Sequence, residues 1–109
     1  MNDDNAVSQL SALAQATRFA VFRLLMRFGK DGMAAGDIAK QLGVPQNTLS
    51  AHLNILSNAH LIVAKRDGRS VIYSINVDST RDLMSYLVND CCDGHPEICS
   101  ISVEQVGCS

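Results

Sequence analysis

Apolar residues recur at intervals of three and four along the first part of the chain, a spacing that predicts amphipathic helices. In residues 6–16 the recurring apolar positions are Val7, Leu10, Leu13 and Ala14. Thr17 is a suitable N-cap for a second helix, which is apolar on nearly every face and which Gly29 ends. We expect this second helix to lie at the centre of the core.

Two shorter helices are predicted in the middle of the chain. Residues 35–42 repeat the apolar pattern, and Gly43 suits the left-handed backbone of a helix end. Pro45 suits the first turn of the next helix, because a proline there loses no hydrogen bond. The buried positions of that helix are predicted to be Leu49, Leu53 and Leu56. Two short helices around a glycine turn are typical of a helix-turn-helix.

From Leu61 onward the composition becomes rich in β-branched residues. Two such runs surround Asp67-Gly68, which predicts a hairpin with a type I′ turn. Asp78 or Ser79 is a suitable cap for a last helix that runs into Cys91-Cys92. The predicted fold is therefore mainly α with a β-hairpin wing, a winged helix-turn-helix in the order α-α-α-α-β-β-α.

Length and composition limit the classes of protein that need to be considered. With 109 residues, 47% of them hydrophobic, the chain can form one small domain, for which a homodimer is plausible. No stretch of about 18 apolar residues and no signal-like start is seen, so we expect a cytoplasmic protein without a membrane partner. Cysteines in that compartment are expected to bind metals or act in redox chemistry rather than form structural disulfides. The chain has four, Cys91, Cys92, Cys99 and Cys108.

The charge of the chain is unevenly distributed. The net charge of -2 argues weakly against a nucleic-acid partner. Residues 40–77, however, contain four basic residues and one acidic residue, whereas residues 78–109 contain one basic and six acidic residues. The basic part coincides with the predicted helix-turn-helix and hairpin, so this segment could meet DNA although the whole chain is acidic.

The second helix of the predicted helix-turn-helix has a polar side suited to reading DNA. With its leucines inward, the residues on or near the exposed side are Gln46, Asn47, Thr48, Ser50, Ala51, His52 and Asn54. Glutamine and asparagine can bond adenine through two hydrogen bonds in the major groove. At the hairpin tip, Arg66 and Arg69 suit phosphates or a neighbouring minor groove. Each feature alone could be ordinary solvated surface, but their order and spacing place both on one side and favour DNA binding.

These segments resemble a known family. The run GVPQNTLSAHLNILSNAHLIVAKRDGRSVIYSI resembles the recognition helix and wing of the ArsR/SmtB family of metal-responsive repressors, and ALAQATRFAVFRLL resembles that family's second helix. The resemblance covers residues 6–92 and implies a winged helix-turn-helix homodimer, built on the first and last helices, that binds an inverted-repeat operator in double-stranded DNA. Pro45 stands where the family often has a capping serine. We therefore expect a DNA-binding and dimerisation domain at residues 1–92 and a cysteine-containing tail at residues 93–109.

The cysteines suggest which inducer the repressor would sense. A known arsenic site of the family would need thiols where this chain has GMAAGDIA, and its zinc-type site on the last helix would need a histidine, which residues 78–90 lack. Cys91, Cys92 and Cys99 remain, and three thiolates suit arsenite or antimonite. The arrangement resembles the C-terminal three-cysteine arsenite site of one branch of the family, which implies that the metalloid releases the operator.

Other interpretations of the cysteines stay open. Zinc or cadmium could bind the same three thiols with His95, or Cys99 could form a redox disulfide with Cys91 or Cys92. The three could also have no sensing role, and Cys108 is predicted to be nonessential. An enzyme such as an arsenate reductase or thiol oxidoreductase is disfavoured, because the chain has no phosphate-binding glycine loop and no Cys-x-x-Cys.

Overall fold

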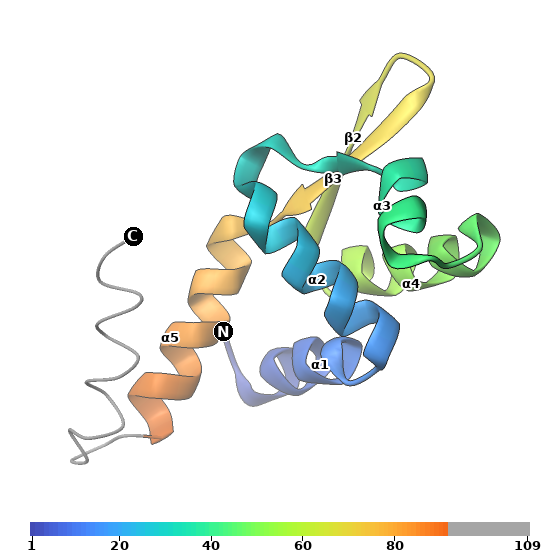
Figure 1. The fold of residues 1–109 in the computed structure, drawn as a ribbon. Coiled ribbons are helices and arrows are strands. Elements are labelled where there is room, and N and C mark those ends of the chain that lie inside the picture. Colours follow the sequence, from blue (N-terminus) through green and yellow to red (C-terminus); the bar gives the residue numbers. More distant parts are fainter. Residues whose placement is uncertain (92–109) are drawn as a thin grey trace.

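The computed structural model describes residues 1–91, the last three of them by their backbone alone. The predicted tail at residues 93–109 lies outside the described residues. The elements, in chain order (Figure 1), are α1 (Asp3–Leu13), α2 (Ala16–Phe28), the 3-10 helix η1 (Gly29–Asp31), β1 (Met33–Ala34), α3 (Ala35–Leu42), α4 (Gln46–Asn58), β2 (Ile62–Asp67), β3 (Ser70–Ile75) and α5 (Val77–Cys91). The predicted mainly helical fold with a hairpin wing is confirmed. In the described part of the chain, no helix is long and apolar enough to cross a membrane.

The helices begin at residues other than those predicted from the sequence. Gln15, not Thr17, caps α2, and its side-chain oxygen accepts a hydrogen bond from the backbone N–H of Arg18 at 2.9 Å. Ahead of α5, Asn76 Oδ1 accepts from the N–H of Ser79 at 3.2 Å, so the predicted caps Asp78 and Ser79 are already helical. Caps compete over a few neighbouring residues, and several polar side chains could satisfy the same free N–H groups.

A short strand that the sequence analysis missed completes the sheet. The strand order is β1-β3-β2, and β1 pairs antiparallel with β3 through Met33 opposite Tyr73 and Ala34 opposite Ile72. Two residues are too few to show an alternating pattern, so the sequence read as a turn there. The strand connects α2 with α3 and attaches the helix-turn-helix to the base of the hairpin.

The hairpin forms as predicted but turns differently. Asp67 pairs with Ser70, so the two loop residues are Gly68 and Arg69 rather than Asp67 and Gly68. Only Gly68 has a positive φ, +63°, whereas a type I′ turn needs positive φ at both central residues. The prediction of a type I′ turn was therefore wrong. Glycine at the first central position with positive φ there alone is the pattern of a type II′ turn, which also matches the twist of a hairpin.

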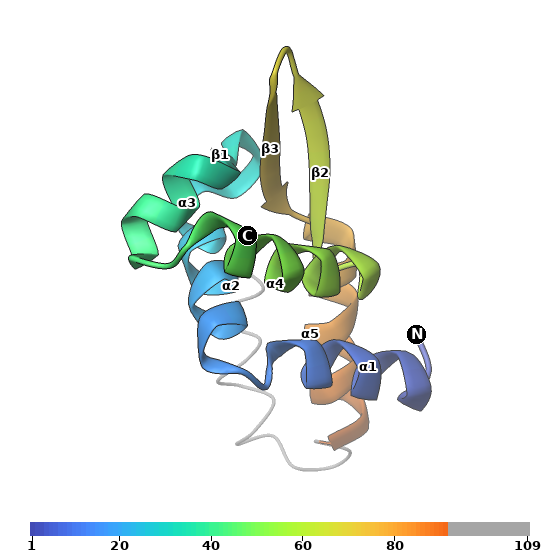
Figure 2. The ribbon, with the colours of Figure 1, turned by 90° about the vertical axis from the view of Figure 1, so that its right-hand side faces the viewer.

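The core forms around α2, which Figures 1 and 2 show between the sheet, α4 and α1. Val21 and Leu25 of this helix are completely buried, as are Leu49 and Leu56 of α4. The helix is not buried on every face as predicted, because Phe19, Met26 and Phe28 are exposed. In α1 the predicted apolar stripe also faces outward, since the buried residues are Ala6, Gln9 and Ala12. Gln9 Nε2 donates to the backbone oxygen of Ala59 at 2.9 Å, which joins α1 to the end of α4.

Gly32 is predicted to be more sensitive to substitution than Gly29. Both have positive φ, +70° and +56°, but a Cβ on Gly32 would overlap the backbone oxygen of Tyr73, whereas a Cβ on Gly29 would meet no atom within 4 Å. We expect Gly29→Ala to lower the free energy of unfolding by about 1 kcal/mol and Gly32→Ala by about 3 kcal/mol. Urea denaturation followed by circular dichroism measures both. Equal losses would contradict the assigned role of the contact with β3.

Candidate nucleic-acid interface

Helix α4 has one buried and one exposed side. Leu49, Leu53 and Leu56 are buried against the core, as predicted. Six of the seven residues predicted for the DNA-facing side are fully exposed, namely Gln46, Asn47, Thr48, Ser50, Ala51 and Asn54. His52 is half-buried, and its ring contacts Arg18 of α2. The polar side chains thus form a continuous surface along the first half of the helix, which is the half that enters a major groove in helix-turn-helix proteins.

The start of α4 uses one of the predicted reading residues as a cap. Pro45 is the N-cap rather than a residue of the first turn, and its extended backbone (φ -61°, ψ 141°) makes no side-chain hydrogen bond. Asn47 Oδ1 instead accepts from the N–H of Thr48 at 2.9 Å. The two amide N–H donors of Asn47 are then the groups suited to a base, and they favour acceptors such as the N7 atoms of purines.

The end of α4 determines how the wing leaves the helix. Leu61 N–H donates to Leu56 O and His60 N–H donates to Ser57 O, which is the hydrogen-bond pattern of a Schellman motif. His60 has a φ of +63° at the position where glycine is usual. Leu61 is completely buried, and its oxygen accepts from Asn76 N–H at the end of the hairpin. The two strands of the wing are therefore anchored directly to the C-terminus of α4.

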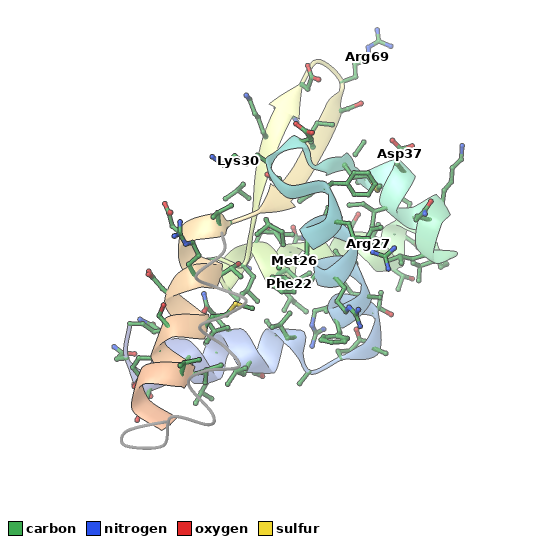
Figure 3. The ribbon with its side chains drawn as sticks, turned by 60° about the vertical axis from the view of Figure 1, so that its left-hand side comes forward. Phe22, Met26, Arg27, Lys30, Asp37 and Arg69 are labelled. Carbon is green, nitrogen blue, oxygen red and sulfur yellow. The ribbon has the colours of Figure 1, made fainter. Side chains whose placement is uncertain are left out.

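The hairpin carries the cationic side chains. Lys65, Arg66 and Arg69 are all exposed. Figure 3 shows Arg69 at the tip, with its guanidinium pointing away from the domain. In Figure 1 the hairpin projects on the same side as α3 and α4, whereas α5 runs along the opposite side. A helix with a polar face beside a cationic hairpin can place hydrogen-bonding groups in one groove while guanidinium groups contact phosphates.

The predicted metalloid site cannot be built from the described residues. Cys91 is the last residue of α5, whereas Cys92 and Cys99 lie outside the described part, as do His95 and Cys108. Within residues 1–91 as far as side chains are described, no group of three histidine, cysteine, aspartate or glutamate residues could hold a metal ion. The assignment of Cys91, Cys92 and Cys99 as ligands stays a prediction.

Comparisons with known proteins point to transcriptional regulators. A family model described as a helix-turn-helix domain matches residues 13–64. The transcriptional repressor SdpR of Bacillus subtilis is 36% identical over 78 residues, which are 72% of this chain and 83% of that protein. The homodimeric winged helix-turn-helix DNA-binding domain of Mb0332 from Mycobacterium bovis superposes with a TM-score of 0.65 at 30% identity, covering 89% of this chain and 92% of the other. An ArsR-like regulator from Rhodococcus sp. RHA1 shares the fold with a TM-score of 0.73 at 21% identity, over 90% of each chain.

Arg69 is predicted to contribute to DNA binding through phosphate contact. We expect Arg69→Ala to weaken binding to specific and unrelated duplexes alike, and to reduce the slope of log K against log salt by about 0.9, the value for one lost phosphate contact. Arg81→Ala is the matched control, because Arg81 is equally exposed but lies on α5. Fluorescence anisotropy at several salt concentrations measures both. A change in slope for Arg81→Ala as large as for Arg69→Ala would argue against the wing.

Proposed function

This chain belongs to the ArsR family of winged helix-turn-helix transcriptional regulators, and we propose that it is a metalloid-responsive repressor. In this proposal a homodimer binds an inverted-repeat operator and releases it when arsenite or antimonite binds Cys91, Cys92 and Cys99. The observation that carries the DNA-binding part is the exposed polar face of α4 beside the cationic hairpin. The similarity to a repressor, SdpR, supports negative regulation.

The outward face of α1 and α5 supports a dimer. Val7 and Leu10 on α1 are 63% and 42% exposed, and Met84 on α5 is 40% exposed. The two helices lie side by side (Figure 2), and the Tyr86 hydroxyl donates to Asp3 Oδ1 between them. Large apolar side chains exposed together on one face are typical of protein interfaces. A second copy of the chain would cover them, as in the homodimeric relative Mb0332.

A dimer of this kind would match an inverted repeat. Two-fold symmetry presents two copies of α4, and their separation must be about 34 Å for both to enter successive major grooves on one side of the duplex. Small changes in the packing of two dimer helices would change that separation. A coupling of about 1.4 kcal/mol lowers DNA affinity tenfold, so a modest rearrangement is enough for release.

The position of the cysteines supports the choice of inducer. The first of them ends α5, the helix whose exposed Met84 belongs to the proposed dimer face. Thiolates prefer soft ions, and trivalent arsenic or antimony binds three of them. Binding at the end of α5 would therefore act on the dimer interface and through it on the spacing of the two α4 helices.

Val7→Glu is predicted to break the dimer. A carboxylate in the centre of an apolar interface is desolvated without a partner, so we expect the protein to become monomeric at micromolar concentration and operator affinity to fall by at least about tenfold. Met26→Glu is the control, since Met26 is 45% exposed but lies on α2. Analytical ultracentrifugation of both variants decides. A Val7→Glu protein that still sediments as the wild-type dimer would place the interface elsewhere.

Arsenite is predicted to release the wild-type protein from its operator. The probe is a labelled duplex from the region upstream of the gene, titrated by fluorescence anisotropy with and without arsenite. We expect at least about tenfold weaker binding with arsenite for wild type and for Cys108→Ser, and no change for the triple variant Cys91→Ser, Cys92→Ser, Cys99→Ser.

Equal affinity of the wild type with and without arsenite would sink the metalloid part of the proposal. The same titration with antimonite, zinc, cadmium and a thiol oxidant then identifies the inducer class. Release by zinc or cadmium would favour a metal site that includes His95, and release by the oxidant would favour a disulfide between Cys99 and Cys91 or Cys92.

A further inference from the structure

Arg18 connects three helices through a single side chain. It lies in the first turn of α2, where the Gln15 cap holds its backbone N–H. Its Nε donates to the backbone oxygen of Ala12 in the last turn of α1 at 2.6 Å. Its Nη1 lies 3.3 Å from Nδ1 of His52 in the middle of α4. No other hydrogen bond between side chains described in the structure joins α2 to the helix that faces DNA.

The contact with Ala12 supplies what α1 lacks. The last carbonyl groups of a helix have no partner within the helix, and a cation near them is favourable. The last turn of α1 contains no basic residue of its own. Arg18 therefore caps α1 from the neighbouring helix, and its guanidinium is held in one orientation by this bond before it reaches His52.

The contact with His52 determines the form of the imidazole ring. A guanidinium has only donors, so Nδ1 of His52 must be the acceptor. The ring is then neutral with its proton on Nε2, and Nε2–H is the donor that His52 can offer. Without Arg18 both tautomers become available, and the half-buried ring loses the bond that orients it.

We propose that Arg18 is a positioning residue for DNA binding, which holds α4 against α1 and sets His52 in its Nε2–H form. This inference rests on the proposed function in that it assigns α1 to the dimer interface and α4 to the operator. A shift of α1 in the dimer would move Ala12, and the same guanidinium would transmit the movement to the centre of α4. Arg18 thus forms a direct connection between the proposed dimer helix and the DNA-facing helix.

The first test is made on the free protein. In the 15N NMR spectrum of the histidine rings at about pH 8, where ordinary histidines are neutral, wild-type His52 should show the Nε2–H tautomer. Arg18→Met retains the length of the side chain but no donor and should give a mixture of tautomers. Arg23→Met removes an exposed arginine of the same helix and should leave the His52 signals unchanged. A Nδ1–H ring in the wild type, or an unchanged ring in Arg18→Met, would overturn the inference.

The second test is a double-mutant cycle on binding to the upstream duplex. We expect Arg18→Met and His52→Ala each to raise Kd about tenfold, the loss of one charge-assisted bond, and the double variant also about tenfold rather than a hundredfold. Arg18→Lys should lie between wild type and Arg18→Met, since one ammonium cannot donate to both acceptors. Additive losses in the double variant would show that the two residues act independently.

Controls separate this inference from the proposed function. Circular dichroism shows whether each variant is folded, and Arg18→Lys replaces Arg18→Met in the ring measurement if the latter unfolds. If the wild-type protein binds no upstream duplex, the proposed operator is wrong. The ring measurement still decides whether Arg18 sets the form of His52, because it needs no DNA.

Discussion

The burial of one side of α4 is the constraint on which the DNA-binding surface depends. Leu49, Leu53 and Leu56 are inaccessible to solvent or nearly so, and their removal from water fixes the rotation of the helix about its axis. Every other residue of α4 then has a determined direction, so the polar residues of its first half must face outward. The reading surface follows from packing and needs no separate interaction to orient it.

The two ends of α4 extend this constraint to its neighbours. At the start, Asn47 satisfies a backbone N–H that Pro45 cannot. At the end, His60 closes the helix and turns the chain into the wing, which Leu61 anchors in the core. The wing is therefore placed by the same helix that it assists. This local arrangement explains how a chain of net charge -2 can bind DNA, since its basic residues are concentrated where the helix and wing meet the same side.

The other side of the molecule has the opposite character. Val7 and Leu10 of α1 and Met84 of α5 are exposed, and the acidic residues of the chain are concentrated from α5 onward. In the proposal this side meets a second copy and receives the inducer, while α4 and the wing meet DNA. Arg18 lies between the two sides and contacts both, which gives a physical route from one to the other without any change in the core.

The sequence by itself determined the helices, the hairpin, the leucine face of α4 and the polar residues opposite, because each depends on the spacing of residues close in the chain. Only the tertiary structure decided the strand β1, the caps Gln15 and Asn76, and the partner of His52. Strand β1 exists because β3 offers it hydrogen bonds from residues some forty positions away. His52 looked like its exposed neighbours in the sequence, yet it contacts an arginine 34 residues earlier. Periodicity cannot report such contacts, because they depend on which segments folding brings together.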